Sequence, residues 1–475
     1  MQEPVMNKTP PANLNMQAFR LGDIRGQYPL EVDENFVVAF AHAFVGEFSL
    51  PGKIATCRDM RESSESLQAA LNAALASIGI DVIDLGLCPT ELGYFASTLP
   101  GIEAAIVVTA SHNPPEYNGL KCVLRNGKAI TTGNGLLAIQ QRMAVGYRHG
   151  MGAGSIERQD CQAQYMEFLR QHFDPEPLRS GKVALNGLNG TAATMAGLIA
   201  DEFELPVTWF RQQPGPMPAQ GADPTNPILA REMQKFMGSD EFSLGVAWDG
   251  DCDRCVVFDS NGQGIPAYYL VGLLTEHFLR GSKGRAIVFD TKLWWNTIDL
   301  IGRFGGNPVR ARTGHAYMKY EMHRHSAVYG GELSSHHYFG DFFGCDSGMF
   351  AWLTVLGLVR DGQSIEGLIA ERRAEIFITP EISLALSDVD NAFAAIESAF
   401  SREALSVDRF DGLSLSMRGG WRFSIKRSKT EPVVRLNFEA RKTPDNLLEE
   451  GRQVFQVLAP YLGDDAASLD RFKII

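Results

Sequence analysis

Short runs of apolar, β-branched residues alternate along this chain with polar or glycine-rich loops and with longer stretches of helical period, and the order repeats several times. Short apolar runs are typical of strands, and a 3.6-residue period is typical of helices. Strands that alternate with helices indicate the α/β class. We therefore expect three similar mixed-sheet α/β domains around a central cleft, with a smaller C-terminal α+β domain.

The predicted elements fall into three units followed by a different fourth part. The first has strands at 53–56, 81–85 and 104–108 and a helix at 64–78, and residues 150–155 form a linker. The second has strands at 182–185 and 242–248 and a helix ending near 201, and the third has strands at 286–290 and 327–329 and a helix at 294–304. The last part has strands at 382–386 and 433–440, a hairpin turning at 418–420, and helices at 391–400 and from 444.

Composition and charge narrow the class of protein. The 475 residues include 44 Lys and Arg against 56 Asp and Glu, a net charge of −12 that argues against a general nucleic-acid or anionic-membrane surface. The longest clean apolar stretch, 349–359, is too short to cross a bilayer, and the polar N-terminus does not resemble a signal peptide. Seven scattered cysteines do not form a disulfide framework. We expect a cytoplasmic protein.

Each of the first three units ends in the same way, with an apolar strand that runs into a compact polar loop. These loops are Thr109-Ala110-Ser111-His112-Asn113-Pro114, then residues 249–254, then residues 331–337. In open α/β sheets, ligands bind beyond the carboxyl ends of the strands. The three loops are therefore expected to face one cleft.

The second loop carries three aspartates at alternate positions, Asp249, Asp251 and Asp253. In an extended segment their carboxylates would project to one side and repel one another unless a cation lies there. Three hard oxygen donors favour Mg²⁺ or Mn²⁺. An EF-hand is excluded because its sixth and twelfth positions would be Arg254 and Ser260. The alternative is a solvated acidic turn.

Other candidate chemistry is less specific. Cys252 and Cys255 form a C-x-x-C, but the chain has no second such pair to complete a zinc site, and a redox role is not favoured. Adjacent histidines at 336 and 337 rarely ligate one zinc ion. Glu332 and Ser334, two residues apart, would present a carboxylate and a hydroxyl to the same side, which suits a pair of sugar hydroxyls.

Ser111 lies just past a predicted buried strand, where an exposed hydroxyl could act as a nucleophile or carry a phosphoryl group. The alternative is an ordinary Ser-His-Asn-Pro turn. Lys121 follows an expected turn at Gly119 and could return to the same cleft. A G-x-S-x-G elbow is absent around Ser111, which weakens an acyl-enzyme interpretation. A Walker A loop is absent from the sequence, so ATP is not supported as the phosphoryl donor.

Six motifs in order carry a resemblance to a known family. They are Phe19-Arg20-Leu21-Gly22-Asp23-Ile24-Arg25-Gly26, Thr109 to Pro114 with Asn118-Gly119-Leu120-Lys121, Asp249 to Arg254, Thr313-Gly314-His315-Ala316, Gly331 to Phe339, and Thr430-Glu431-Pro432. With them the chain resembles the α-D-phosphohexomutases, and most of all the bacterial phosphomannomutases, over essentially its whole length. The resemblance implies four domains, at 1–152, 153–262, 263–376 and 377–475.

The resemblance also implies a mechanism. Ser111 would be a phosphoserine that converts a hexose phosphate into a hexose 1,6-bisphosphate, which then returns its other phosphoryl group. The same bisphosphate would serve as activator. One Mg²⁺ would bind Asp249, Asp251, Asp253 and an oxygen on Ser111. His112 and Lys121 would handle protons or stabilise charge near the serine, and Arg254 would contact the group in transfer.

Substrate-binding positions follow from the same resemblance. They are Arg25, Lys292, His315, Glu332, Ser334 and His336 in the cleft, and Arg427, Ser428, Lys429 and Thr430 in a phosphate-binding loop. The chain departs from the family pattern at four positions. Lysine stands in place of arginine at 426 and of asparagine at 429, glycine in place of tyrosine at 22, and cysteine in place of glycine at 57.

These observations predict a cytoplasmic, Mg²⁺-dependent phosphomannomutase, monomer or homodimer, that acts on phosphohexoses and serves GDP-mannose biosynthesis. It would bind neither nucleic acid nor membrane. A phosphoglucomutase or dual-specificity enzyme is the nearest alternative, because one hydroxyl orientation separates the sugars. A phosphatase-like hydrolase would use the same serine, metal and cations with water as acceptor. A sugar-phosphate binder without turnover is the third alternative.

Overall fold

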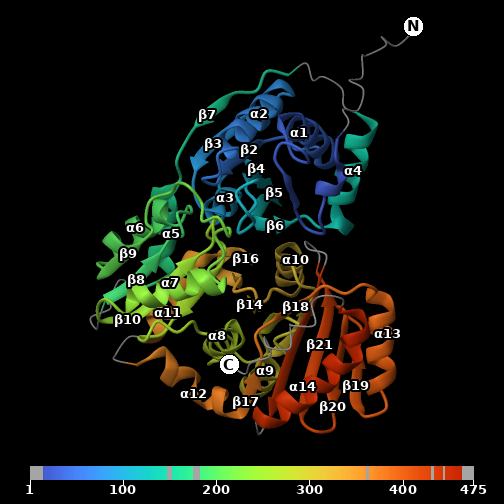
Figure 1. Cartoon of the computed structure of the whole chain (residues 1–475). Coiled ribbons are helices and arrows are strands. Elements are labelled where there is room, and N and C mark those ends of the chain that lie inside the picture. The colour runs from blue at the N-terminus through green and yellow to red at the C-terminus, as the bar shows by residue number, and fades with distance from the viewer. Residues whose placement is uncertain are drawn as a thin grey trace.

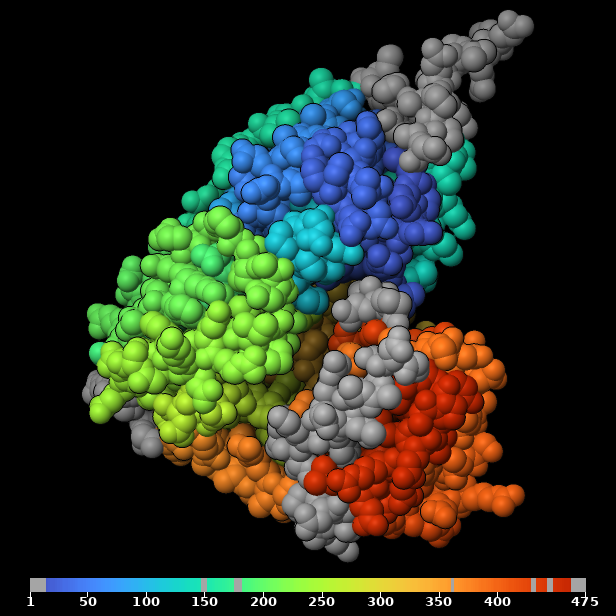
Figure 2. Space-filling view, in the orientation of Figure 1, coloured from blue at the N-terminus to red at the C-terminus, as the bar shows by residue number. Residues whose placement is uncertain are grey.

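A computed structural model of the chain describes residues 14–146, 152–174, 182–359, 363–428, 433–441 and 444–462. The described chain forms four units, each built around its own sheet (Figure 1). The space-filling view shows the surface hollowed between the blue and green units and the orange and red one (Figure 2). Among the described residues, the model has no helix both long and apolar enough to span a bilayer.

The first unit has a seven-stranded sheet in the order β1-β5-β4-β2-β3-β7, with β6 paired to β5. Its strands are β1 (Ile24–Gln27), β2 (Lys53–Arg58), β3 (Val82–Leu87), β4 (Ile102–Val108), β5 (Tyr117–Leu124), β6 (Lys128–Ala129) and β7 (Ile156–Arg158). Its helices are α1 (Glu34–Phe48), α2 (Ser64–Ser77), α3 (Thr90–Ala96) and α4 (Leu136–Val145). Because β7 pairs with β3, this sheet also includes residues after the expected limit at 152. The domain limits themselves stay predictions.

The second unit has a four-stranded sheet in the order β11-β10-β8-β9, and the third a five-stranded sheet in the order β13-β12-β14-β15-β16. The second contains α5 (Gln162–His172), β8 (Lys182–Asn186), α6 (Ala193–Glu202), β9 (Val207–Phe210), α7 (Pro227–Met237), β10 (Phe242–Trp248) and β11 (Cys255–Phe258). The third contains α8 (Ala267–Leu279), β12 (Ala286–Asp290), α9 (Trp294–Phe304), β13 (Asn307–Ala311), α10 (His315–His325), β14 (Tyr329–Gly331), β15 (His337–Phe339), β16 (Cys345–Asp346), α11 (Gly348–Val359) and α12 (Ile365–Glu375).

One arrangement repeats in all three units. Three parallel strands are followed by a strand that turns back antiparallel to the third: β5 beside β4, β11 beside β10, and β15 beside β14. The three polar loops of the sequence are the connections into these returning strands. This confirms that the chain contains three similar mixed-sheet α/β units, and it places the loops at equivalent corners.

The fourth unit differs because its sheet is antiparallel throughout, in the order β17-β22-β21-β20-β19 with β18 also paired to β22. Its elements are β17 (Ile376–Ile378), β18 (Ile382–Leu384), α13 (Val389–Phe400), β19 (Ala404–Asp408), β20 (Leu413–Met417), β21 (Trp421–Arg427), β22 (Val434–Arg441) and α14 (Pro444–Leu458). The hairpin between β20 and β21 turns at 418–420, and α14 begins at Pro444, as the sequence predicted.

The apolar core explains why three units form one body. A single cluster of buried side chains includes Val107 of β4, Leu185 of β8, Val257 of β11 and Phe289 of β12, so the first three sheets share it. The fourth unit has a separate core around its own sheet, with Phe423 and Phe438 inside. Burial of apolar surface therefore holds the first three units together, and Ile376 and Ile378 of β17 join the fourth unit's sheet to the same core.

Two local predictions were wrong. The strand expected at 327–329 is β14, Tyr329–Gly331, because α10 runs to His325 and ends in a left-handed Ser326, which delays the strand. Gly119 is not a turn; it lies inside β5, paired with Arg25 of β1. Other predicted strands and helices were confirmed within a few residues of their ends.

Candidate active site

The loop after β4 holds Ser111 in an unusual backbone conformation. Ser111 has φ 54° and is fully buried, and its backbone N–H donates to Thr109 Oγ1 at 2.8 Å. Thr109 in turn donates to Asp59 Oδ2 at 2.7 Å. A non-glycine residue in the left-handed region is strained and persists only where its surroundings enforce it. Here the hydrogen bonds through Thr109 do so.

Arg61 fixes the rest of this loop, and the sequence analysis assigned it no role. Its guanidinium is paired with Asp59 at 3.0 Å and is almost fully buried. It donates to four backbone carbonyls, at 2.7 to 2.8 Å: those of Ser111, Asn113, Pro114 and Tyr117. Four of the five donors of one guanidinium thereby reach the turn, and the fifth is held by Asp59. The signal in the sequence was an Asp-x-Arg directly after a predicted strand.

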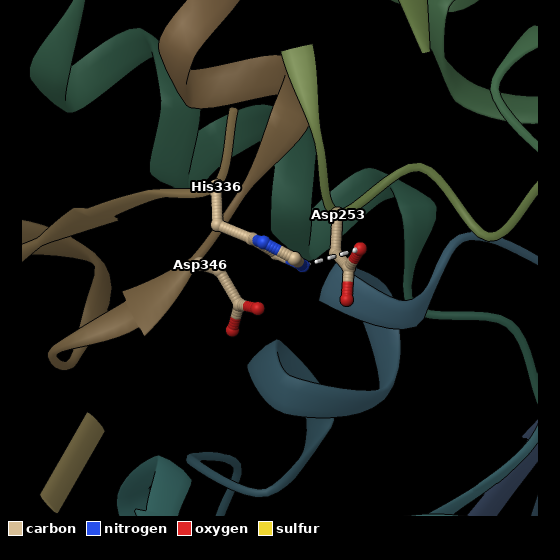
Figure 3. Close-up of side chains that lie close together, drawn as sticks. All are labelled: Asp253, His336 and Asp346. Atoms are coloured by element: carbon tan, nitrogen blue, oxygen red, sulfur yellow. Dashed lines mark ion pairs between the residues drawn. The ribbon is translucent and has the colours of Figure 1, made fainter. Parts of the chain in front are cut away.

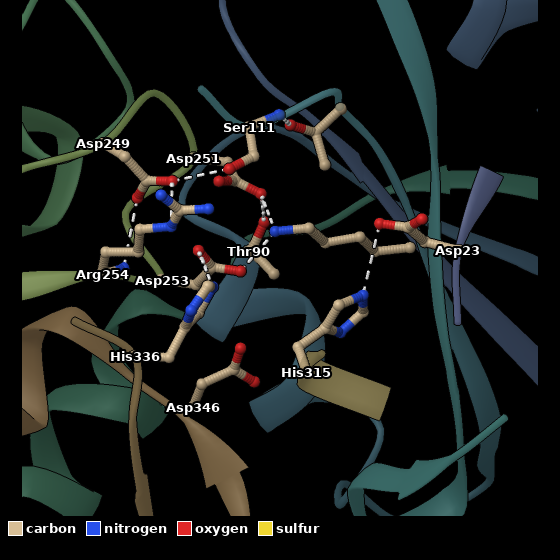
Figure 4. Close-up of polar contacts among 12 residues, drawn as sticks. Asp23, Thr90, Ser111, Asp249, Asp251, Asp253, Arg254, His315, His336 and Asp346 are labelled. Carbon is tan, nitrogen blue, oxygen red and sulfur yellow. Dashed lines mark hydrogen bonds and ion pairs between the residues drawn. The ribbon is translucent and has the colours of Figure 1, made fainter. Parts of the chain in front are cut away.

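The loop after β10 approaches the serine loop closely, at a glycine. A Cβ at Gly250 would lie 2.6 Å from the carbonyl oxygen of Ser111, a distance that real Cβ atoms do not show. Because Gly250 has no side chain, Ser111 Oγ reaches Asp249 Oδ2 and donates to it at 2.6 Å. The structure therefore brings the candidate nucleophile and the aspartate loop into direct contact (Figure 4).

The three aspartates converge, although not in the way that the sequence suggested. The segment is a turn with Cys252 at φ 66°, not an extended strand, and its carboxylates still come within 4.8 Å of one another. All three are fully buried. The prediction that the three carboxylates lie close together is confirmed, but the predicted extended conformation is wrong. The turn, and not alternation along a strand, brings the three side chains together.

Lys121 lies among these carboxylates. Its ammonium donates to Asp251 Oδ2 at 2.7 Å and also to Asp253 Oδ2, and it is 1% exposed. Burial alone would lower the pKa of Lys121, but Asp251 and Asp253 outweigh it and raise the pKa. Thr90, the first residue of α3, donates to Asp251 Oδ2 at 2.6 Å. Lys121 thus arrives from within β5, next to β4, and not from a turn.

The aspartates fit a bound divalent cation. Asp251 Oδ1 and Asp253 Oδ1 are buried without a hydrogen-bond partner. Burial, followed by the neighbouring Asp253 and Asp251, raises the pKa of Asp249 to about 7. Lys121 pairs with Asp251 and Asp253, and Arg254 Nε lies 3.7 Å from Asp249 Oδ2, but the two unpaired carboxylate oxygens are still costly to bury unless a cation lies against them. The donors are all hard oxygens, which is the ligand set of Mg²⁺ or Mn²⁺.

His112 and Arg254 lie on the side of Ser111 facing the aspartates. Arg254 donates to His112 Nδ1 at 2.8 Å, and Ser111 Oγ is 3.1 Å from the same nitrogen. Burial and the positive charges of Arg254 and Arg25 hold the pKa of His112 well below its usual range. Arg25 donates to Asp23 at 2.9 Å and to the side chain of Asn113 at 2.8 Å. Two guanidinium groups therefore flank the serine loop.

The loop between β14 and β15 places Glu332, Ser334 and His336 against the metal loop, as we call the aspartate-bearing residues 249–254. His336 Nε2 lies 3.3 Å from Asp253 Oδ1, and its Nδ1 is 2.8 Å from Ser334 Oγ. Glu332 accepts from the Gly314 N–H at 2.7 Å and from Tyr338 at 2.6 Å. Sequence neighbours at 332, 334 and 336 therefore do share one side of the loop.

Asp253, His336 and Asp346 form a second close group, with ligand atoms within 4.8 Å of one another (Figure 3). The ammonium of Lys319, 2.7 Å from Asp346 Oδ1, already balances the charge of that carboxylate. The aspartate trio is therefore the stronger candidate cation site of the two. His337 points elsewhere, with its Nδ1 2.7 Å from the hydroxyl of Tyr329.

Two expected site residues from the third unit face different units of the protein. Lys292 donates to Glu381 Oε2 at 2.7 Å. His315, the first residue of α10, lies with its Nε2 3.4 Å from Asp23 Oδ2. His315 thus joins the serine side of the site through Asp23 and Arg25, whereas Lys292 is tied to Glu381 between β17 and β18.

The expected phosphate-binding loop is described only in part. Lys426 is paired with Asp411, which also accepts from the Thr313 N–H at 2.9 Å. Arg427 is paired with Asp390 on α13, an almost fully exposed carboxylate. The Ser428 N–H donates to the carbonyl of Val433 at 2.8 Å. Lys429 and Thr430 lie outside the described residues. In this structure Arg427 is therefore engaged at the surface, away from the serine loop.

Cys252 and Cys255 are buried thiols, and all seven cysteines of the chain lie in described segments and are free. Burial raises the pKa of Cys252 well above its usual range. A thiol that stays protonated is a poor nucleophile and metal ligand. The side chains of this segment that matter chemically are therefore Asp249, Asp251 and Asp253.

Three family models match the chain in order. Phosphoglucomutase/phosphomannomutase alpha/beta/alpha domains I, II and III match residues 16–144, 163–262 and 266–375. A phosphomannomutase of Escherichia coli is 38% identical over 441 residues, covering 90% of this chain and 95% of the relative. A protein of Xanthomonas campestris named phosphohexose mutases is 36% identical over 432 residues, covering 90% of this chain and 96% of the relative. A crystal structure of a phosphoglucomutase/phosphomannomutase family protein of Burkholderia thailandensis superimposes with TM-score 0.83 at 26% identity, covering 97% of this chain and 99% of that one.

Proposed function

This chain belongs to the phosphoglucomutase/phosphomannomutase family, and we propose that it interconverts mannose 6-phosphate and mannose 1-phosphate. The family assignment makes it a phosphohexose mutase, an isomerase that moves a phosphoryl group between two hydroxyls of one sugar. Identity of 38% to a phosphomannomutase over 90% of the chain supports mannose as the sugar. The single geometric observation that supports the chemistry is the 2.6 Å contact between Ser111 Oγ and Asp249 Oδ2.

In the proposed reaction Ser111 is phosphorylated and gives its phosphoryl group to the free hydroxyl of the hexose phosphate. The bond from phosphorus to Oγ breaks as the bond to the sugar oxygen forms, and the proton of that sugar hydroxyl passes to the neutral imidazole of His112, which yields a hexose 1,6-bisphosphate. The bisphosphate then turns over in the cleft and returns its other phosphoryl group to Ser111. A supply of the bisphosphate keeps the serine phosphorylated, and we propose it as the activator.

Charge explains why so many cations surround the serine. A phosphoserine brings about −1.5 to −2 charges, beside three buried aspartates. A second, phosphate-bearing anion can approach only if positive groups offset this charge, and such positioning and stabilisation are most of phosphoryl-transfer catalysis. We propose that Arg254, Lys121 and Arg25 do this, with His112 as a neutral neighbour. Their contacts to the aspartates and to the serine loop support these roles.

Family membership implies a metal ion, and the aspartate trio is an acidic cluster that fits one. We propose that Asp249, Asp251 and Asp253, together with an oxygen on Ser111, hold one Mg²⁺. When bound, the ion supplies electrostatic stabilisation to the phosphoryl oxygens. The chain's own part is to keep the three carboxylates converged, which the turn at Cys252 and the hydrogen bond from Thr90 achieve.

Sugar recognition is proposed for the third loop and the neighbouring elements. Glu332, Ser334 and His336 face the metal loop, and the buried carboxylate and the hydroxyl are suited to sugar hydroxyls. Lys292 and His315 are proposed as further substrate-binding residues of the cleft, His315 on the serine side and Lys292 beside Glu381. In the fourth unit we propose Arg427, Ser428, Lys429 and Thr430 as its phosphate-binding loop. The seven free cysteines are compatible with a cytoplasmic location, which we also propose.

A dual-specificity or phosphoglucomutase activity is the second candidate, because the Xanthomonas campestris relative is named for phosphohexoses in general. A coupled assay that supplies mannose 1-phosphate or glucose 1-phosphate, each with hexose 1,6-bisphosphate and Mg²⁺, separates the two. We expect a kcat/KM for mannose at least about tenfold above that for glucose, the size of one well-made hydrogen bond to a sugar hydroxyl. Equal values would establish dual specificity, and release of phosphate without isomerisation would refute a mutase.

A further inference from the structure

A chain of buried polar side chains crosses the boundary between the first and third units, and none of the roles proposed above uses its centre. The centre is Lys319 on α10, which is 1% exposed. Its ammonium lies 2.7 Å from Asp346 Oδ1, 3.0 Å from the hydroxyl of Tyr94 and 3.0 Å from Nδ1 of His315. Tyr94 belongs to α3 of the first unit, and Asp346 to β16 of the third.

The number of hydrogens on Lys319 fixes the direction of these bonds. A lysine ammonium has three hydrogen-bond donors and no acceptor. Asp346 accepts one, and Tyr94, whose pKa burial raises well above its usual range, stays a phenol and accepts the second. The third points to Nδ1 of His315, which must therefore carry its lone pair. The imidazole proton is then on Nε2.

The other nitrogen of His315 faces Asp23 of the first unit, on the serine side of the site. Nε2 is buried, has no hydrogen-bond partner, and lies 3.4 Å from Asp23 Oδ2 (Figure 4). That oxygen already accepts from Arg25 Nε at 2.9 Å. Burial and the charge of Lys319 lower the pKa of His315. The imidazole is thus neutral, and its Nε2 faces a carboxylate whose oxygen Arg25 already occupies.

The backbone holds the ring in this place. The notable contact is Gly22, where an added Cβ would lie 2.6 Å from the Cβ of Ala316. The bend before β1 therefore packs directly on the first turn of α10. His315 has little freedom to leave Asp23, and its orientation depends on which ring nitrogen is protonated.

We propose that Lys319 is a positioning residue, which fixes His315 as the neutral tautomer with the proton on Nε2 so that this N–H donates to the phosphate of the bound hexose phosphate. The inference rests on the proposed function in one respect, namely that the ligand carries a phosphate. Its logic is one of sign. The opposite tautomer would direct the Nε2 lone pair at the phosphate oxygens and repel them. The Nε2–H tautomer instead offers a hydrogen-bond donor. Because it leaves the ring uncharged, it does not form an ion pair with Asp23.

The first test is the tautomer itself, measured on the full chain. Nitrogen chemical shifts of ¹⁵N-histidine-labelled protein distinguish the two neutral forms and the imidazolium, and His315→Gln assigns the signal. At pH 7.5 we expect the neutral Nε2–H form. A signal of the Nδ1–H form, or of a charged ring, in the wild type would overturn the proposal without any variant.

Two variants then test the role of Lys319. Lys319→Met combined with Asp346→Asn removes the ammonium without leaving a buried carboxylate unpaired, and we expect a mixture of tautomers at His315. Tyr94→Phe is the matched control, because it keeps both the ammonium and its other two partners; here the Nε2–H form should persist. A double variant that keeps the pure Nε2–H form would overturn the role of Lys319.

Kinetics link the tautomer to the ligand. In the double variant we expect the KM for mannose 1-phosphate to rise about tenfold, the effect of one hydrogen bond to a charged group, with kcat within about threefold. Tyr94→Phe should change neither. If the double variant lost the Nε2–H form of His315 but kept the wild-type KM, the contact between His315 and the phosphate would be refuted. The nitrogen chemical shifts can be measured without turnover. If the chain had no mutase activity, the proposed function would be refuted, but the tautomer of His315 would still test the role of Lys319.

Discussion

Gly250→Ala tests whether the close approach of two loops sets the rate of phosphoryl transfer. The new Cβ would lie 2.6 Å from the carbonyl oxygen of Ser111, and ordinary contact begins at 3.4 Å, so the loops must separate by about 0.8 Å. The contact from Ser111 Oγ to Asp249 Oδ2, now 2.6 Å, would lengthen out of hydrogen-bond range. A misplacement near 1 Å costs roughly 100-fold in rate, and we expect a fall of about that size in kcat.

The assay is the coupled mutase assay with mannose 1-phosphate, read together with a thermal melt. Gly197→Ala is the matched control, because a Cβ at that position of α6 meets nothing within 4 Å. It should leave kcat unchanged and add about 0.5–1 kcal/mol of stability through helix propensity. If Gly250→Ala kept kcat within twofold while folding normally, the spacing of these two loops would not control the reaction.

Three further predictions concern the serine, the aspartates and a buried acid. Ser111→Ala should abolish mutase activity while the melting temperature stays near that of the wild type, and a phosphorylated chain should vanish from its intact mass; near-normal turnover would reject the phosphoserine. Asp251→Asn removes one carboxylate of the trio, so calorimetric titration with Mn²⁺ should show affinity at least about tenfold weaker, and equal affinity would contradict the metal assignment. Burial raises the pKa of Glu91 to about 7, above the ordinary 4.5, so its contribution to stability is complete below pH 4.5 and is lost as pH rises through 7. Glu91→Gln should therefore unfold at higher urea than the wild type at pH 8, by about 3 kcal/mol, with the gap closing toward pH 4.5; a constant gap would refute the buried charge.

Much of the fold was predictable because apolar runs and polar breaks mark it directly. The strand 286–290 and the helix 294–304 have the same bounds in β12 and α9. The errors occurred where backbone geometry outweighed the pattern. Ser326 in a left-handed conformation delayed β14, and Gly119 was mistaken for a turn although it lies within β5. In the sequence, a glycine that forms a turn looks the same as a glycine inside a strand that allows another backbone to pack closely against it.

The sequence also identified which loops matter, because each follows an apolar strand and carries reactive side chains at short spacing. It did not show how the loops are held. Arg61, Thr90 and Lys319 each bond to groups tens to hundreds of residues away, with separations such as 161 positions between Thr90 and Asp251. Such partners have no local pattern, so only the folded chain pairs them.

The sequence by itself determined the class of fold, the order of three similar units, and the chemistry available in each loop, because strand period, loop composition and residue type are local properties. Only the tertiary structure decided that Ser111 touches Asp249, that the aspartates converge through a turn, and that the ammonium of Lys319 lies 3.0 Å from Nδ1 of His315. Those facts depend on close packing between units far apart in the chain, where a few tenths of an ångström decide which atoms can bond.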